Sequence, residues 1–170
     1  MRQIIVDGYN VIRADPRLLS FERVSLEHAR ETLVRTLAGS PRLVNDQIVV
    51  VFDGGLGTRS HVHMQRMGRI QLMYSARGQT ADEVIVQHVR TLSGRGPVIV
   101  VTNDVEVREH CRAEGCEVSS SENLLGQVAG RPLPRRAQDE DDREPSLSTE
   151  KRGNPRRSSK KSRQQREVRF

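Results

Sequence analysis

Aspartates that come directly after apolar runs are the first candidates for chemistry in this sequence. The runs are short and rich in β-branched residues, which is typical of buried strands in a parallel sheet. The carboxyl ends of parallel strands share one edge of the sheet, and open α/β sheets bind their ligands at that edge. We therefore expect three carboxylates to gather there: Asp7 after residues 4–6, Asp53 after residues 48–52 and Asp104 shortly after residues 98–101.

A fourth aspartate, Asp82, lies in the segment Thr80-Ala81-Asp82-Glu83. This segment predicts a capping box, in which Thr80 and Glu83 each satisfy the other's backbone donor at the start of a helix that runs to about residue 92. Taken singly, each aspartate has an ordinary role as a turn residue or as an acidic residue at a helix N-terminus. Four of them at one edge favour a common function.

Crowded carboxylates need a compensating charge. Two of them about 4 Å apart repel each other by roughly 4 kcal/mol at an effective dielectric constant of 20. Residues 1–130 contain no Lys. A divalent cation such as Mg²⁺ takes oxygen ligands and keeps several waters. Such an ion orients a water for attack on phosphorus, so the pattern predicts phosphodiester hydrolysis.

The elements that position these residues alternate between strand and helix. Expected strands cover residues 4–6, 47–52, 70–75, 98–101 and 117–119, and expected helices cover residues 26–37, 80–92, 103–113 and 122–128. The helix from Asn103 is predicted to begin with a second capping box that uses Glu106. Gly8 is expected to give a sharp turn after the first strand, and Asp15-Pro16 to mark a loop. This order predicts an α/β fold with a mostly parallel sheet covered on both faces.

Basic side chains are expected to hold a nucleic-acid backbone near the acidic residues. The long segment 54–70 is expected to be a loop over the same edge, and it contains Arg59, Arg66 and Arg69; Arg77 follows it. Arg pairs with phosphate in two-point geometry. Tyr9 is open to two interpretations, stacking on a base or packing at the sheet edge. A zinc site at His61 and His63 is the weaker alternative, because no further ligand lies near them in the sequence.

Net charge divides the chain into two parts. The formal charge is +6, yet residues 1–130 are neutral and residues 131–170 carry the whole excess. Residues 139–144 are acidic, whereas residues 151–170 are basic and include Lys160 and Lys161. This composition predicts a disordered tail that binds polyanions such as ribosomal RNA. Cys111 and Cys116 are expected to be reduced thiols, and the absence of a signal peptide or membrane span predicts a cytoplasmic protein.

Four motifs together resemble the YacP-like branch of the NYN nucleases, relatives of the PIN-domain ribonucleases. They are Ile5-Val6-Asp7-Gly8-Tyr9-Asn10, Phe52-Asp53-Gly54, Thr80-Ala81-Asp82-Glu83 and Thr102-Asn103-Asp104. The resemblance covers about residues 3–128 and implies a three-layer α/β/α sandwich. It implies that an acidic cluster holds Mg²⁺ or Mn²⁺ and cuts single-stranded RNA, with messenger RNA on the ribosome as one expected target.

The same resemblance implies a role for each motif residue. Asp7, Asp82 and Asp104 are the expected principal metal ligands and Asp53 a fourth. Asn10 and Asn103 are expected to support them, while Glu83 is ambiguous because the capping box already uses it. The nuclease domain is expected to end near residue 130, and the oligomeric state is left open. The competing interpretation is a catalytically weak RNA- or ribosome-binding module.

Two other α/β enzyme or signalling classes are excluded by single residues. A phospho-receiver domain needs a lysine that residues 1–130 lack. A phosphatase of the haloacid dehalogenase type needs a second aspartate two residues after the first, where this chain has Tyr9.

Overall fold

A computed structural model describes residues 1–54, 60–92, 94 and 96–130. They all belong to the first of two units into which the chain divides, Met1–Pro134 and Arg135–Phe170. The strands are β1 (Gln3–Asp7), β2 (Gln47–Phe52), β3 (His63–Met67), β4 (Ile70–Tyr74), β5 (Val98–Val101) and β6 (Glu117–Ser119). The helices are α1 (Gly8–Ala14), α2 (Pro16–Glu22), α3 (Leu26–Ala38), α4 (Ala81–Leu92), α5 (Val105–Ala113) and α6 (Ser121–Val128), with a 3₁₀ turn at Pro41–Leu43.

The strands form one six-stranded sheet in the order β3-β4-β2-β1-β5-β6. All neighbouring pairs are parallel except β3 with β4. The switch in strand order places β1 between β2 and β5, so Asp7 at the end of β1 lies between the ends of those two strands. The predicted α/β fold with a mostly parallel sheet is confirmed.

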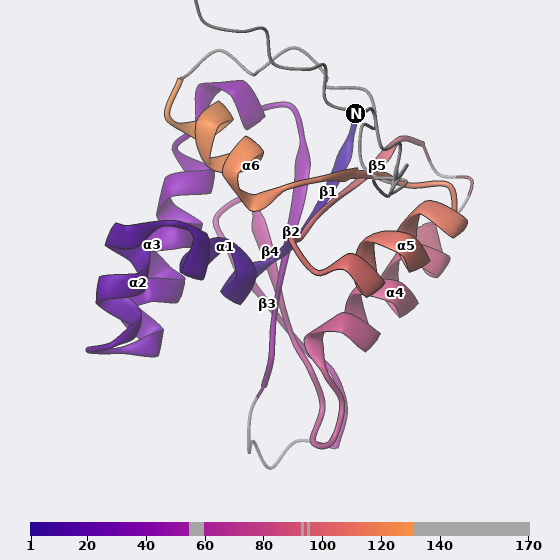
Figure 1. The fold of residues 1–170 in the computed structure, drawn as a ribbon, viewed down its shortest axis with the longest axis horizontal. Helices are drawn as coiled ribbons and strands as arrows, with labels where there is room; N and C mark the ends of the chain where they lie inside the picture. The colour runs from indigo at the N-terminus through magenta and orange to yellow at the C-terminus, as the bar shows by residue number, and fades with distance from the viewer. Residues whose placement is uncertain (55–59, 93, 95, 131–170) are drawn as a thin grey trace, which may run out of the picture. The chain divides into compact units, whose positions relative to one another are not determined.

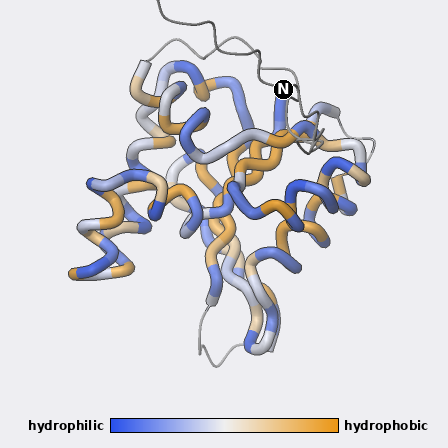
Figure 2. Tube along the Cα trace, in the orientation of Figure 1, coloured by the Kyte–Doolittle hydropathy of each residue, from blue (hydrophilic) through white to orange (hydrophobic). Residues whose placement is uncertain are grey.

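Helices cover both faces of the sheet, as Figure 1 shows. Side chains alternate along β1 and β2, because successive residues of a strand point to opposite faces. Ile4, Val6 and Phe52 pack on the side of α1, α2, α3 and α6. Ile5 and Val51 pack on the side of α4 and α5. The central strands are accordingly the most hydrophobic part of the trace in Figure 2, and the result is the expected three-layer sandwich.

Local signals located several elements correctly. Ser25 caps α3 by accepting a hydrogen bond from the His28 backbone N–H at 3.2 Å. Gly115 ends the region of α5 with a φ of 81°, in the left-handed conformation that favours glycine. Both cysteines are free, and Cys111 is buried.

Four predicted features differ from the structure. No turn separates β1 from the next element: α1 starts at Gly8, where a Cβ would lie 2.2 Å from the Phe52 ring, so close packing explains the glycine. Asp15-Pro16 begins α2, because Pro fits the first turn of a helix and the Asp15 carboxylate caps it. Residues 63–67 form the edge strand β3 rather than a loop. Helix α5 begins at Val105, since the Asp104 carboxylate provides the cap that was assigned to Asn103.

Candidate active site

Asp7 is buried at the end of β1, with 7% of its surface exposed. It is also the N-cap of α1, so one carboxylate oxygen accepts a hydrogen bond from the Asn10 backbone N–H at 3.2 Å. The other oxygen accepts a hydrogen bond from the Thr102 hydroxyl at 3.1 Å. Burial raises the pKa of Asp7 above its ordinary value and the charge of Asp104 raises it further, while the hydrogen bonds from Asn10 and Thr102 act in the opposite direction.

Thr102 contacts two of the aspartates, a position for which the sequence reasoning gave it no role. It is completely buried at the end of β5. Its hydroxyl donates to Asp7 and accepts a hydrogen bond from the Asp104 backbone N–H at 3.1 Å. The Asp104 carboxylate in turn accepts from the Val107 N–H at 3.0 Å. One hydroxyl therefore fixes the orientation of Asp7 relative to the start of α5.

Asp53 follows β2 beside the end of β4. The Ser75 hydroxyl donates to the Asp53 carboxylate at 3.3 Å and accepts from the Gly54 backbone N–H at 2.9 Å. A Cβ at position 54 would lie 2.2 Å from the Ser75 carbonyl oxygen, so only glycine allows this approach. The short contact between β2 and β4 fixes where Asp53 leaves the sheet.

Asp82 lies in the first turn of α4, which the predicted capping box starts. The Glu83 carboxylate accepts from the Thr80 N–H, and the Thr80 hydroxyl accepts from the Glu83 N–H, both at 3.2 Å. Glu83 therefore serves the helix. Desolvation raises the pKa of Asp82, and the charges of Asp7, Asp104 and Asp53 raise it further, in that order. The three strand-end aspartates thus act electrostatically on the helix residue.

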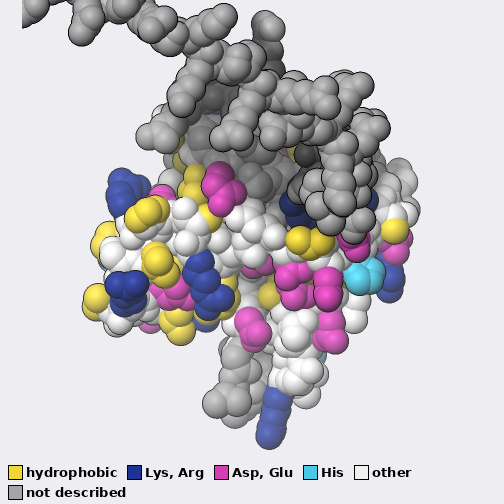
Figure 3. Space-filling view, viewed as in Figure 1, with side chains coloured by type: hydrophobic (Ala, Val, Ile, Leu, Met, Phe, Trp, Pro, Cys, Tyr) yellow, Lys and Arg dark blue, Asp and Glu magenta, His cyan; other side chains and the backbone are white. Residues whose placement is uncertain are grey.

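A pocket of about 530 Å³ joins these residues. It is lined by five carboxylates, one of which, Glu122 at the start of α6, was missed because it lies outside the four motifs. One Arg side chain, Arg13, also lines it. Figure 3 shows acidic side chains gathered over the lower centre of this face and basic ones on the α1–α3 side. The carboxylates are Asp7, Asp53, Asp82, Asp104 and Glu122.

Asn10 and Asn103 hold three elements together at the rim of this pocket. The Asn10 side-chain oxygen accepts from the Asn103 N–H at 3.1 Å and from the Ser121 hydroxyl at 3.2 Å. The Asn103 side chain accepts from the Ser121 N–H and donates to Glu122, both at 2.9 Å. These hydrogen bonds connect α1, the segment before α5 and the start of α6.

The donor set fits a hard divalent cation such as Mg²⁺ or Mn²⁺. Carboxylate oxygens are the ligands that these ions prefer, and no ion pair in the described part of the chain neutralises Asp7, Asp82 or Asp104. Within the described ranges, however, no three acidic, His or Cys side chains lie close enough together to hold a metal ion jointly. The arrangement therefore suits an ion that takes one or two carboxylates and retains waters.

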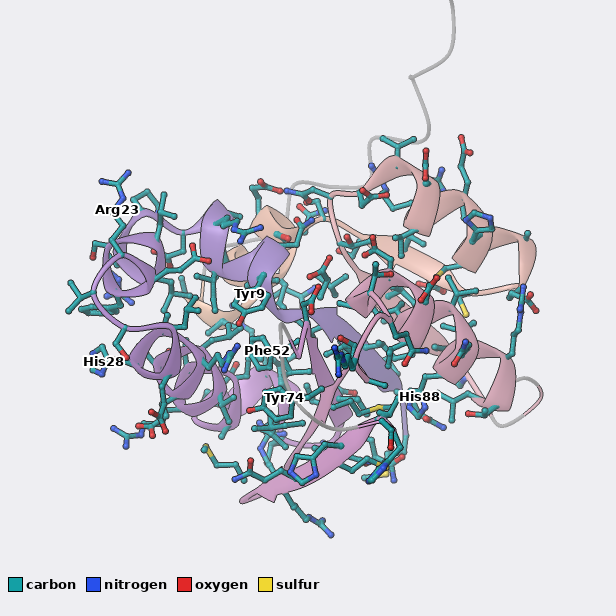
Figure 4. All side chains as sticks on the ribbon, turned by 90° about the horizontal axis from the view of Figure 1, so that it is seen from below. Tyr9, Arg23, His28, Phe52, Tyr74 and His88 are labelled. Atoms are coloured by element: carbon teal, nitrogen blue, oxygen red, sulfur yellow. The ribbon has the colours of Figure 1, made fainter. Side chains whose placement is uncertain are left out.

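Tyr9 lies at the pocket but is already engaged by other side chains. Its hydroxyl accepts a hydrogen bond from Arg30, and its ring meets the Phe52 ring edge-on with 5.3 Å between centroids. Phe52 stacks on Tyr74, which stacks on His63. Figure 4, which looks onto the carboxyl edge of the sheet, shows Tyr9, Phe52 and Tyr74 in a row. These contacts support the packing interpretation of Tyr9.

Two arginines predicted to flank the acidic residues lie at the other edge of the sheet. Chain direction reverses between β3 and β4, so Arg66 and Arg69 sit beside Ile70, whose register partner is Ile48 at the start of β2. Arg69 donates to four backbone carbonyls between residues 37 and 43. The prediction was wrong because the residue composition of this segment does not reveal that β3 and β4 form an antiparallel hairpin. Arg77 is exposed between β4 and α4.

The remaining predicted contacts lie outside the described residues. They are Arg59 and the tail residues 131–170, including the acidic segment 139–144 and the basic segment 151–170 with Lys160 and Lys161. No helix in the described part of the chain combines the length and apolar character that a membrane crossing requires.

Comparison with known proteins gives three consistent results. The YacP-like NYN domain matches residues 4–168, which extends beyond the expected limit near residue 128. The uncharacterized protein YacP of Bacillus subtilis is 29% identical over 126 residues, 74% of each chain. Two crystal structures of Rae1 (YacP) from Bacillus subtilis are similar to this chain. The structure of a tryptophan-to-leucine mutant gives a TM-score of 0.65, and the second structure gives 0.64. Their sequence identities are 27% and 28%, and the matches cover 76% of this chain and 76% and 75% of theirs.

Proposed function

Because the chain belongs to the YacP-like NYN domain family, a PIN-like nuclease fold, we propose that it is a metal-dependent endoribonuclease that cleaves single-stranded RNA. The observation that carries the proposal is the pocket at the carboxyl edge of the sheet. Five carboxylates from five different elements or loops line it, and the pKa of both Asp7 and Asp82 is raised by burial and by neighbouring carboxylates. Concentrated negative charge without a neutralising Lys supports a cation site.

In this proposal one or two of the carboxylates of Asp7, Asp82, Asp104 and Asp53 would coordinate Mg²⁺ or Mn²⁺ directly, and the others would contact the waters that the ion retains. The ion supplies an activated water and stabilises negative charge on the phosphate oxygens. Thr102 and the Asn10 backbone N–H keep the Asp7 carboxylate in one orientation. The hydrogen bonds of Asn10 and Asn103 keep α1, α5 and α6 in register around the pocket.

We further propose messenger RNA as the substrate and the ribosome as a partner reached through the tail. Residues 151–170 carry a net charge of +8, which supports sequence-independent attraction to RNA through counterion release. Removal of residues 131–170 is expected to leave cleavage of a short free RNA intact and to weaken binding to ribosomes. Equal ribosome binding by the full and the truncated chain contradicts the role of the tail.

A second candidate is an RNA-binding module with little catalytic power. It is favoured by one observation, namely that the described acidic side chains form no group of three able to hold a metal ion as they are placed. Both candidates predict RNA binding, so only a catalytic measurement separates them.

The deciding experiment measures cleavage of a labelled single-stranded RNA by the full chain with Mn²⁺, with Mg²⁺ and with EDTA. We expect cleavage that requires the divalent ion and that Asp7→Asn abolishes. Asp15→Asn is the matched control, because Asp15 also caps a helix but is absent from the pocket lining. Equal cleavage rates in Asp7→Asn and the wild type would contradict the catalytic proposal and favour the RNA-binding module.

A further inference from the structure

Two arginines meet at Tyr9, beside the part of the pocket that α1 lines. The guanidinium carbon of Arg13 lies over the Tyr9 ring at 5.5 Å from its centroid, and that of Arg30 lies over it at 5.2 Å. Arg13 and Tyr9 both line the acidic pocket. Arg30 is tied to Tyr9 by the hydrogen bond to its hydroxyl. Arg13 thus brings a positive charge to the pocket itself, and Arg30 adds a second one behind the Tyr9 ring.

The positive charge of Arg30 lacks an acidic partner in the described part of the chain. Its guanidinium carbon also lies over the rings of Phe52 and Tyr74, at 5.4 and 5.5 Å. Its Nε is buried without a hydrogen-bond partner. Ring faces offset only part of the cost of desolvating a cation. The charge of this partly buried guanidinium is therefore only partly compensated within the described part of the chain.

Arg13 has an acidic partner and also faces solvent. Its Nη2 lies 3.3 Å from a carboxylate oxygen of Glu22, and 64% of the Arg13 side chain is exposed. Only 13% of the Glu22 side chain is exposed, so the guanidinium faces solvent while its carboxylate partner is largely buried. A phosphate offers the same guanidinium two parallel charge-assisted hydrogen bonds. The solvent-facing part of the Arg13 guanidinium can therefore meet a phosphate group while its Nη2 keeps the contact with Glu22.

An RNA strand that reaches the carboxylates needs cations beside them, because its phosphates are repelled by the acidic pocket. Arg66 and Arg69 lie at the opposite edge of the sheet and do not serve. We infer that Arg13 and Arg30 form a phosphate subsite that holds the RNA backbone next to the scissile bond, so that the strand leaves the pocket over α1 and α3. The inference rests on the proposed function only in taking RNA as the ligand.

Salt dependence of binding tests the subsite without requiring cleavage. A fluorescent short oligouridylate is titrated with the full chain in EDTA, between about 50 and 200 mM salt. Each lost phosphate contact on single-stranded RNA lowers the slope of log K against log salt by about 0.7. We expect that decrease in Arg13→Gln and in Arg30→Met, with roughly three- to tenfold weaker binding at the lowest salt. The tail contributes equally to all variants.

Matched variants separate a phosphate contact from a structural effect. Arg23→Gln removes an exposed arginine at the end of α2 that Figure 4 shows far from Tyr9, and it should leave the slope unchanged. Glu22→Gln frees Arg13 and should tighten binding. Arg30→Lys keeps the charge and should restore most of the slope lost in Arg30→Met. Where Arg30→Met lowers the melting temperature strongly, the opposite effects of Arg13→Gln and Glu22→Gln decide the question.

Two outcomes overturn the inference, and they differ from failure of the proposed function. Slopes equal to that of the wild type in both Arg13→Gln and Arg30→Met, with both variants folded, rule out the subsite, even if the protein cleaves RNA. Binding that weakens in Arg23→Gln as much as in Arg13→Gln shows a diffuse charge effect and also rules it out. If the wild type shows no cleavage that depends on a divalent ion, the proposed enzymatic activity is wrong. The salt dependence of RNA binding still tests the subsite in that case.

Discussion

Asp7 and Asp46 lie at opposite ends of the same sheet, and each has 7% of its surface exposed. The two oxygens of Asp46 accept hydrogen bonds from the Arg2 guanidinium at 2.9 and 2.8 Å. Those of Asp7 accept only from a backbone N–H and a hydroxyl, which carry no charge. The protein is able to neutralise a buried carboxylate and does so at the amino edge. At the carboxyl edge no ion pair in the described part of the chain compensates Asp7.

The arginines show the same contrast between the two edges. Arg69 donates to four backbone carbonyls near the end of α3, so its hydrogen-bonding capacity is used within the fold. Arg30 donates to one hydroxyl and leaves its Nε without a partner. The completed contacts of Arg69 indicate a structural role, whereas Arg30 leaves part of its hydrogen-bonding capacity unused.

The largest expected effect is a loss of activity when Asp7, but not Asp46, is replaced by asparagine. Asp7→Asn should lower kcat for RNA cleavage by about 100-fold or more, with an unchanged or higher melting temperature, because it removes a buried charge whose pKa is raised. Asp46→Asn should lower stability by about 1 kcal/mol and leave kcat unchanged. Rate assays and thermal unfolding of both variants check this, and a loss of kcat in Asp46→Asn would remove the contrast.

Arg69 provides the next largest effect, and it concerns stability. Arg69→Ala should lower the free energy of unfolding by about 2 kcal/mol, since four carbonyl acceptors lose a charged donor. Arg66→Ala, at an exposed position of β3, should change it by less than about 0.5 kcal/mol. Urea unfolding measures both. Neither variant should alter the dependence of RNA binding on salt. A lower slope in either variant would indicate that the arginine contacts RNA.

Thr102 tests whether orientation of Asp7 matters as much as its charge. Thr102→Val keeps the shape of the side chain but removes the hydroxyl that contacts Asp7 and the Asp104 N–H. We expect kcat to fall about tenfold. Thr102→Ser should recover most of the rate because it restores the hydroxyl. Equal rates in Thr102→Val and the wild type would show that the backbone N–H alone orients Asp7.

The smallest expected effect is a stabilisation by Mg²⁺ that depends on pH. Burial, then neighbouring carboxylates, raises the pKa of Asp82 in the folded state, and burial raises that of Asp7. The folded state therefore binds more protons than the unfolded state, and this contribution to stability, complete below the unfolded pKa of about 4, is lost as pH rises through the raised values.

Mg²⁺ at five times its Kd should restore about 1 kcal/mol at neutral pH and much less at acid pH. Differential scanning calorimetry across the pH range measures this, with Asp7→Asn/Asp82→Asn as the control that should not respond. Equal stabilisation of the wild type and the double variant would place the ion elsewhere.

Local patterns in the sequence located five of the six strands and the starts of α3 and α4, but they missed β3, α1 and α2. The apolar β-branched runs located β1, β2 and β5, and the capping box at Thr80 located α4, because both signals depend on a few neighbouring residues. The signals failed where side-chain packing decided the outcome. Gly8 was interpreted as a turn, whereas its contact with Phe52 allows α1 to start directly after β1.

What the sequence determined by itself is the meeting of Asp7, Asp53 and Asp104 at one edge, because alternating strands and helices allow only a parallel sheet with a common carboxyl end. Tertiary structure decided which other side chains join them. Glu122, Thr102 and the arginine pair at Tyr9 come from elements distant in the chain, and their positions depend on strand order and helix packing. The reversal of chain direction at β3 moved Arg66 and Arg69 to the other edge, which no local pattern records.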